Sequence, residues 1–181
     1  HLWFRGRKNF RRRSQGPRAG DALLRTEFRK AVLPEELRSL QAFDRKVFPK
    51  SDWFPAAHWH TCESYWLLID GVKAGCCALQ PHADFLEDLN EDNAPARGTL
   101  YISSTGILPR YQGRGFGQLL KCWQIAYARQ HRFARIVTNT RQRNAAMIAL
   151  NRKFGFRIVR ISPRYYSGPS DATVVMELLL A

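Results

Sequence analysis

Apolar residues alternate with polar ones, or form short runs, in seven segments that have the length of β-strands. Asp70 and Gly71 separate two of these segments and predict a tight hairpin turn. Pro109 ends another segment, because proline cannot continue a central strand. Residues 162–171, between the last two segments, are predicted as a loop. The predicted strands lie at 22–33, 65–70, 72–79, 99–108, 134–139, 156–161 and 172–180.

Four other segments have helical features. Residues 34–49 have Pro34 in the first turn, acids near the start and bases near the end, which is the charge order that a helix dipole favours. In a later helix, Asn144 lies at the N-cap position and Gly155 just beyond the end. The predicted helices lie at 34–49, 52–64, 144–155 and from 116 onward, where Phe116, Leu119, Leu120, Trp123 and Tyr127 share one face.

Strands interleaved with helices indicate a layered fold. We therefore expect an α/β (α+β layered) fold with a mixed central sheet flanked by about four helices. The chain has 181 residues, 45% of them hydrophobic, so it is long enough for one well-buried domain and short for two. We expect a single domain over 21–181. No apolar run approaches the roughly 18 residues that a membrane helix needs, so we expect a soluble protein.

Charge is distributed unevenly along the chain. The net charge is +14, and half of this excess lies in residues 1–20, which contain seven basic residues and no acid. This segment is interpreted as a basic, flexible tail; a basic arm attracted to RNA or the ribosome and an organelle-targeting segment are the alternatives. Five carboxylates lie within 84–92, whereas 93–170 contain none. The long acid-free segment therefore cannot supply a carboxylate ligand or base.

The cysteines do not indicate a disulfide framework or a metal site. Cys62, Cys76, Cys77 and Cys122 include one adjacent pair and no CxxC motif, so they are interpreted as reduced thiols of a cytoplasmic protein. His58 and His60 lie close to Cys62 in "HWHTC", but no well-spaced fourth ligand follows, and no metal is expected. Cys122 is predicted to be packed against the fold rather than to act as a nucleophile.

The segment "RYQGRGFGQLLKCW", residues 110–123, carries the main functional signal. Its alternating glycines lead directly into a helix, and a glycine loop at a helix N-terminus offers amides and positive potential to a phosphate. A Walker A loop is excluded, because Gly117 is followed by Gln118 and Leu119. A dinucleotide-binding fingerprint is excluded too, because the third glycine and the ribose-binding acid are missing.

Two motifs resemble those of the GNAT acetyltransferase superfamily. "ILPRYQGRGFGQLL" is similar to its acyl-CoA signature, Q/R-x-x-G-x-G/A, which Gln112, Gly115 and Gly117 match. "NAAMIALNRKFGF", which begins at Asn144, is similar to the family's Asn-led helix that ends in Gly-Phe. The resemblance covers nearly everything but the tail. It implies the GNAT fold and acetyl-CoA as co-substrate, without a metal.

The resemblance also implies roles for individual residues. The loop and helix start would wrap the pyrophosphate of CoA, the preceding strand end would bind the pantetheine arm, and Asn144 would touch the cofactor. The amide of Ile107 would stabilise the thioester oxygen as it gains negative charge. The implied cofactor-binding residues are Thr105, Gly106, Ile107, Gln112, Gly113, Arg114, Gly115, Phe116, Gly117, Gln118 and Asn144.

The sequence departs from the family at the positions that handle protons. Many members have a tyrosine acid where this chain has Asn151, and a glutamate base where it has Asn139. The acceptor amine must still lose a proton before it attacks. The candidates for accepting it are Glu63, the His82/Asp84 loop, Tyr101, Tyr165, Tyr166, or water. Of these, Tyr166 is the candidate catalytic residue.

The acceptor is left open between a small molecule, a protein N-terminus and a lysine. "RYYSGPSDATVVMEL" near the C-terminus resembles the Tyr-Tyr loop and last strand of protein N-terminal acetyltransferases, although the two aromatics equally suit a packed hairpin. The acidic residues of 84–92 are a further candidate for recruiting a cationic amine. The expected activity is direct transfer of acetyl to a primary amine. The alternative is a basic RNA- or ribosome-associated binding module on a degenerate acetyltransferase fold.

Overall fold

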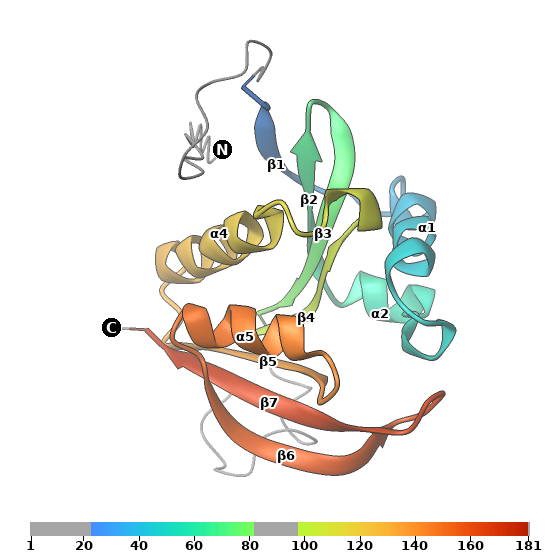
Figure 1. Cartoon of the computed structure of the whole chain (residues 1–181). Coiled ribbons are helices and arrows are strands. Elements are labelled where there is room, and N and C mark those ends of the chain that lie inside the picture. The colour runs from blue at the N-terminus through green and yellow to red at the C-terminus, as the bar shows by residue number, and fades with distance from the viewer. Residues whose placement is uncertain (1–22, 82–97, 181) are drawn as a thin grey trace, which may run out of the picture.

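A computed structural model describes residues 23–81 and 98–180, which form a mixed, twisted sheet (Figure 1). The order of the seven strands is β1-β2-β3-β4-β5-β7-β6. Only β4 and β5 pair in parallel, while all other neighbours are antiparallel. The strands are β1 (Thr26–Lys30), β2 (Glu63–Ile69), β3 (Val72–Gln80), β4 (Thr99–Ile107), β5 (Arg135–Arg141), β6 (Arg157–Tyr166) and β7 (Asp171–Leu179).

Helices cover both faces of this sheet (Figure 1). One face packs against α4 and α5 around Leu120, Trp123 and their neighbours, and the other packs against α1 and α2 around Trp59 and Trp66. The layered fold with a mixed sheet is therefore confirmed. The helices of the described residues are α1 (Leu37–Val47), α2 (Ala56–His60), α4 (Phe116–Gln130) and α5 (Ala145–Lys153), with short 3₁₀ turns η1 (Lys50–Asp52) and η2 (Pro109–Tyr111).

Two of the differences from the sequence-based element boundaries bear on the site. The helix predicted at 52–64 is reduced to α2, because the extended residue Pro55 precedes it and fixes its start. Strand β6 runs on into the predicted loop at 162–171 and ends at Tyr166, which pairs with Asp171 of β7. Tyr165 and Tyr166 therefore lie on a strand of a hairpin rather than in a loop.

The prediction for Cys122 was wrong. Cys122 is exposed on α4, whereas its neighbour Lys121 is buried. The apolar spacing of this helix predicted its buried face correctly around Leu120 and Trp123, but that face also includes Lys121 and Gln124. A buried lysine has no apolar signature, so periodicity could not place it.

Several predictions fall outside the described residues. They concern the basic tail at 1–20, the acidic residues of 84–92, and His82 with Asp84 as candidates for a base. In the segments 23–81 and 98–180, no helix combines the length and apolar character needed to cross a membrane.

The sheet opens between its two central strands. Pairing of β4 with β5 begins at Thr99 and ends at Ile102, opposite Thr138, although both strands continue beyond these residues. Ile102 faces Leu79 on β3 and Ser104 faces Ala78, so Ser103 is an extra, bulged residue on β4. A bulge increases local twist and ends regular pairing. Figure 1 accordingly shows β1–β4 and β5–β6 running in different directions.

Candidate active site

Beyond Ile102, where pairing with β5 ends, the edge of β4 presents unpaired backbone groups to the opening. The amide of Leu108 donates to the carbonyl of Ala74 on β3 at 2.9 Å. Hydrogen-bonded and non-hydrogen-bonded pairs alternate along an antiparallel ladder, so Gly106 also directs its backbone groups at β3. Thr105 and Ile107 direct their backbone groups the other way, toward the side on which β5 no longer pairs with β4. These two amides are the donors that the opening offers.

The three residues predicted to bind the pantetheine arm thus differ in what they present. The carbonyl of Ile107 accepts from Nε2 of Gln112 at 2.9 Å, which ties the following loop to the strand end. A Cβ on Gly106 would lie 3.0 Å from Cγ1 of Val47 and 3.2 Å from Phe43 and Phe48. Gly106 is therefore a glycine because α1 and the residue after it pack closely on it.

The glycine loop leaves a run of amides unpaired. Gly113 has φ +70° and Gly115, the N-cap of α4, has φ +84°, which residues with a Cβ rarely adopt. Within the described residues, no amide from Gly113 to Gln118 donates to a carbonyl or side chain, and pairing resumes with Leu119, which donates to Gly115 at 3.2 Å. A helix N-terminus with unpaired amides binds anions, so the loop fits a diphosphate.

Cations surround this loop, and no ion pair of the described residues neutralises those on it. The guanidinium groups of Arg110 and Arg114 lie 4.9 Å and 5.7 Å from the ring centre of Tyr111. Lys153 of α5 donates to the side chain of Gln118 at 3.1 Å. The local positive potential adds to the helix dipole and strengthens the fit to a diphosphate.

Asn144 caps α5 as its position predicts. Its side-chain Oδ1 accepts from the amide of Met147 at 3.2 Å, and the residue is exposed. The N-cap is confirmed, whereas a contact of Asn144 with a cofactor stays a prediction. Gln112 donates its own amide to Pro109 at 3.1 Å, so both its amide and its side chain brace the loop.

On the sheet face opposite α4, a chain of hydrogen bonds joins four strands, β4, β5, β6 and β7. The hydroxyl of Tyr101 on β4 donates to Oδ1 of Asn139 on β5. Nδ2 of Asn139 donates in turn to the Tyr166 hydroxyl at 2.9 Å and to Thr173 at 3.0 Å. Burial raises the pKa of Tyr101 and of Tyr166, so both stay protonated at neutral pH. Neither tyrosine is a ready base.

The other described candidates for a base are less well placed. Glu63 accepts from the hydroxyl of Tyr127 at 2.9 Å and so lies on the α4 face, away from the Tyr101–Asn139–Tyr166 chain. The Tyr165 ring meets that of Tyr166 edge-on with centroids 5.0 Å apart, and its side chain is largely exposed. Among these candidates, Tyr101 and Tyr166 bond to Asn139, the residue that follows the last β4–β5 pair.

His58 is the residue that sequence reasoning missed. Its Nε2 lies 3.5 Å from Oγ of Ser103, the bulged residue of β4, and Sγ of Cys62 lies 3.6 Å from the same hydroxyl. Stacking on Phe54, with ring centroids 3.9 Å apart, holds the imidazole in place. Burial lowers the pKa of His58, so the ring is neutral at pH 7 and able to accept a proton.

The motif "HWHTC" contains His58, but from the sequence it was considered only as a possible metal site. In the structure His60 is exposed, and no three His, Cys, Asp or Glu side chains of the described residues converge on a point that could hold a metal. The motif instead brings one histidine and one cysteine to the hydroxyl of Ser103.

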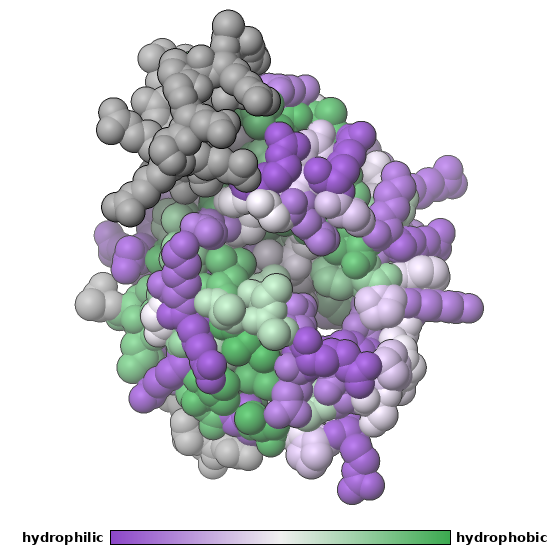
Figure 2. Space-filling model, in the orientation of Figure 1, coloured by the Kyte–Doolittle hydropathy of each residue, from purple (hydrophilic) through white to green (hydrophobic). Residues whose placement is uncertain are grey.

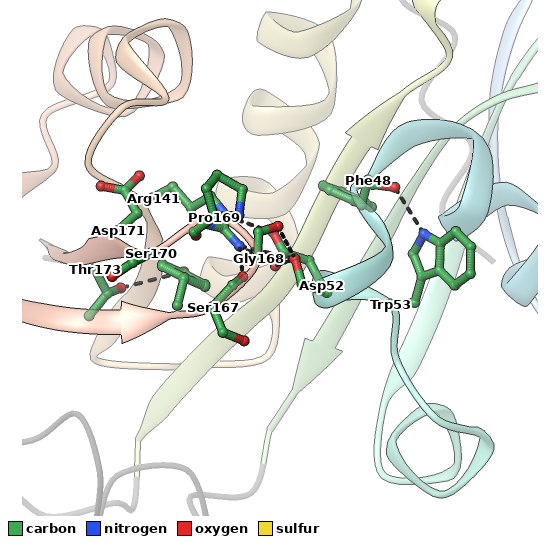
Figure 3. A network of polar contacts seen from close by, with 12 residues as sticks. Phe48, Asp52, Trp53, Arg141, Ser167, Gly168, Pro169, Ser170, Asp171 and Thr173 are labelled. Carbon is green, nitrogen blue, oxygen red and sulfur yellow. Dashed lines mark hydrogen bonds and ion pairs between the residues drawn. The ribbon is translucent and has the colours of Figure 1, made fainter.

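An ion pair joins η1 to β5 at the edge of the opening, and its arginine also binds the turn between β6 and β7 (Figure 3). Arg141 of β5 donates to both carboxylate oxygens of Asp52, at 2.6 Å and 2.9 Å, and its guanidinium lies 4.4 Å from the ring centre of Tyr166. It also donates to the carbonyls of Pro169 at 2.6 Å and Ser167 at 2.9 Å. We call this set of contacts the Arg141 bridge.

Two further hydrogen bonds support the Arg141 bridge. Ser51 donates to the carbonyl of Gly168 at 3.0 Å, which adds a second link between the same two loops. Trp53 donates through Nε1 to the carbonyl of Phe48 at 2.9 Å, which fixes η1 against the end of α1 (Figure 3). The bridge thus closes one side of the opening with groups from three distant parts of the chain.

Known proteins share this architecture. The Drosophila melanogaster protein named "Probable N-acetyltransferase san" is 27% identical over 158 residues, which cover 82% of this chain and 78% of the relative. The structure of the ribosomal-protein-S18-alanine N-acetyltransferase from Escherichia coli matches 86% of this chain and 94% of its own, with a TM-score of 0.70 and 16% identity. Naa50 of Arabidopsis thaliana, solved with the bisubstrate analogue CoA-Ac-MVNAL, matches 86% of this chain and 99% of its own, with a TM-score of 0.70 and 19% identity.

A family model gives the sequence-level match. The model of the acetyltransferase (GNAT) family matches residues 31–156, well over half of the chain. The matched range contains the parted end of β4, the glycine loop with its unpaired amides, and α5 with its asparagine cap. On this match, and with the fold and the loop geometry in agreement, the chain belongs to the GNAT acetyltransferase family.

Proposed function

We propose that this protein transfers an acetyl group from acetyl-CoA directly to a primary amine. The observation that carries the proposal is the run of unpaired amides from Gly113 to Gln118, beside a strand end whose Thr105 and Ile107 amides face an opening in the sheet. Acetyl-CoA would supply the acyl group, activated as a thioester. The loop amides, with Arg114 on the same loop, bind its diphosphate.

The remaining predicted residues complete this site. The Thr105 and Ile107 backbone groups hold the pantetheine arm, and the Ile107 amide, with the Thr105 amide as the alternative donor, stabilises charge on the thioester oxygen. Asn144 contacts the cofactor while it caps α5. Tyr166, which the side chain of Asn139 holds in place, lines the acceptor side.

His58 accepts the proton of the incoming amine. The acceptor arrives as an ammonium ion and must lose a proton before it can attack. His58 is neutral, lies on the face opposite α4, and reaches the opening through Ser103. No carboxylate of the described residues stands in this position, so the histidine replaces the missing glutamate.

The acceptor that the site favours is the amino terminus of a peptide. The Arabidopsis relative was solved with an analogue that joins CoA to a peptide, and the Escherichia coli relative is named for a protein alanine. Tyr166 and the Arg141 bridge line the corresponding side of the opening here. The comparisons add nothing in favour of the RNA- or ribosome-binding alternative.

A matched pair of glycine variants tests cofactor binding. Gly113 and Gly71 both have positive φ, +70° and +81°, and in both cases a Cβ would meet nothing within 4 Å. Gly113→Ala and Gly71→Ala should therefore lose similar stability, but only the first should weaken acetyl-CoA binding. Acetyl-CoA should raise the melting temperature of the wild type and of Gly71→Ala. Absence of a shift in the wild type would refute the proposal.

The acceptor and the base are tested by release of CoA thiol. Peptides with free N-termini should be acetylated faster than lysine side chains or small amines, and the reverse order would contradict the acceptor assignment. His58→Asn should lower kcat/KM by about 10²-fold and remove its acidic limb. The control is His60→Asn, because His60 is exposed two residues away and should be without effect.

A further inference from the structure

Lys121 is a buried cation that has no anionic partner among the described residues. Its residue is 1% exposed on α4, where lysine is seldom buried without pairing. The ammonium lies 5.1 Å from the ring centre of Phe156, and no oxygen of the described residues accepts a hydrogen bond from it. Such a group is costly to bury unless a ligand completes its contacts.

The surroundings of Lys121 place it beneath the opening between β4 and β5. On one side lies Cys77 of β3, which pairs with Thr105 of β4 and is close enough to interact electrostatically with the ammonium. On the other side lies Phe156, the residue just before β6. The ammonium therefore lies under the part of β4 whose backbone faces the opening.

A second buried polar group lies beside the same strand without a full set of partners. Gln124, one turn further along α4, donates through Nε2 to the Thr105 hydroxyl at 2.8 Å, while its Oε1 is buried and unpaired within the described residues. Hydrogen-bonding capacity thus remains for a group that enters beside Thr105. Lys121 supplies donors there and Gln124 an acceptor.

The residue that would otherwise supply a proton in this region cannot do so. Asn151 is 1% exposed, and its Nδ2 contacts Sδ of Met176 at 3.7 Å, while its Oδ1 is buried and unpaired within the described residues. A neutral amide does not release a proton at any physiological pH. The leaving thiolate therefore needs another donor.

We propose that Lys121 donates a proton to the CoA sulfur as it departs, a role that rests on the proposed acetyl transfer. The acceptor nitrogen forms the new C–N bond with the acyl carbon, and the C–S bond breaks with its electron pair left on sulfur. Lys121 then gives one N–H proton to that sulfur, which leaves as the thiol. The acceptor nitrogen loses two protons in all, one to His58 before it attacks and a second to solvent as the amide forms. The neutral amine of Lys121 regains a proton from solvent, and His58 returns its own to solvent, so one proton is released for each acetyl group transferred.

The acidity of Lys121 suits this transfer. Burial lowers the pKa of its ammonium to about 8, close to the value of about 8.5 for an ordinary thiol, so the proton moves between groups of similar affinity. Of the titratable groups in the described residues, only the Cys77 thiol interacts electrostatically with Lys121, and burial raises the pKa of that thiol to about 12. Cys77 therefore stays neutral and does not compete for the proton.

Titration of bound CoA tests the proposal without turnover. The ultraviolet absorbance of the thiolate is followed against pH for CoA bound to the wild type, to Lys121→Met and to a control, Lys46→Met, which removes an exposed lysine of α1. A cation beside a thiol favours the thiolate. The bound thiol should titrate at least about one pH unit lower in the wild type and the control than in Lys121→Met.

The outcomes separate this inference from the proposed function. If CoA binds both the wild type and Lys121→Met and its thiol titrates at the same pH in both, Lys121 does not contact the sulfur. The role of Lys121 is then refuted, while the proposed function stands. If CoA binds neither protein, the proposed function fails and the role of Lys121 with it. A desulfo analogue of CoA should bind wild type and Lys121→Met equally, which shows that the loop is intact in the variant.

Kinetics and a second variant separate charge from proton transfer. Lys121→Met should lower kcat on the order of 10²-fold while the KM for acetyl-CoA changes by less than about threefold. Lys121→Arg keeps the cation but holds its proton, so the bound thiol should still titrate low while kcat falls. An arginine variant with wild-type kcat would show that only charge is needed and would overturn the proton transfer.

Discussion

Removal of Arg141 should weaken the contact between η1 and the turn between β6 and β7, which would then retain the hydrogen bond from Ser51 to Gly168. The Arg141 and Asp52 side chains are 11% and 19% exposed, and the pair is bidentate with distances of 2.6 Å and 2.9 Å. Two backbone carbonyls, of Ser167 and Pro169, depend on the same guanidinium. Arg141→Ala therefore leaves a half-buried carboxylate and two carbonyls without their donor.

The expected loss of stability in Arg141→Ala follows from these contacts. Breaking a buried ion pair costs about 3 to 5 kcal/mol, and the partial exposure of Asp52 favours the lower end. We expect Arg141→Ala to lower the free energy of unfolding by about 3 kcal/mol. At about 2 to 4 °C per kcal/mol for a chain of this length, the melting temperature should fall by about 6 to 12 °C.

A double-mutant cycle in urea measures the pair itself. Arg141→Ala, Asp52→Asn and the double variant should show a coupling energy of about 1.5 to 3 kcal/mol. The pair of Arg143 and Asp171 is the matched control, because it spans the same hairpin at 3.0 Å with an arginine that is 56% exposed. An exposed pair of this kind contributes below about 1 kcal/mol.

Two results would refute the reasoning about the bridge. Additive effects of Arg141→Ala and Asp52→Asn would show that the contact does not stabilise the fold. A cost for Arg141→Ala no larger than that for Arg143→Ala would show that its burial is irrelevant. A functional readout accompanies the cycle: the KM for a peptide acceptor should rise in Arg141→Ala, while the affinity for acetyl-CoA stays unchanged.

Two further predictions concern stability. Gly106→Ala places a Cβ 3.0 Å from Val47 and should lower the free energy of unfolding by about 1 to 3 kcal/mol in urea, so an unchanged midpoint would contradict the close packing of α1. Burial raises the pKa of Asp44 to about 6, so the folded protein binds this proton more tightly than the unfolded chain, and the stabilisation from it is lost as pH rises through about 6. The free energy of unfolding of the wild type minus that of Asp44→Asn should fall by up to about 3 kcal/mol between about pH 3.5 and about pH 7, and a difference independent of pH would contradict this.

Local features of the chain were readable because their causes are local. The glycine loop follows from Gly113 and Gly115, whose backbone angles only glycine adopts readily, and from the apolar face of the helix that they open. The cap at Asn144 needs only an amide three residues away. The sequence therefore predicted the strands, the helices and the glycine loop, to within a few residues at most ends.

The opening in the sheet and the residues around it were decided by tertiary structure. The sequence predicted strands at β4 and β5, but not that their pairing would stop after Ile102. Arg141 and Asp52 are 89 residues apart, and no sequence pattern around either residue predicts their contact. His58 gained its place only when α2 packed against the bulge at Ser103.

Lys121 shows most clearly where a sequence pattern stops being informative. Its spacing on α4 made it an ordinary polar residue, next to a cysteine that was expected to be buried. It is buried because β3 on one side and Phe156 on the other close over that face of the helix. Helix caps and the backbone angles of glycines act within a turn or two of the chain and can be read from it. The environment of a side chain depends on which distant segments pack around it, and that was set only when the sheet and its helices came together.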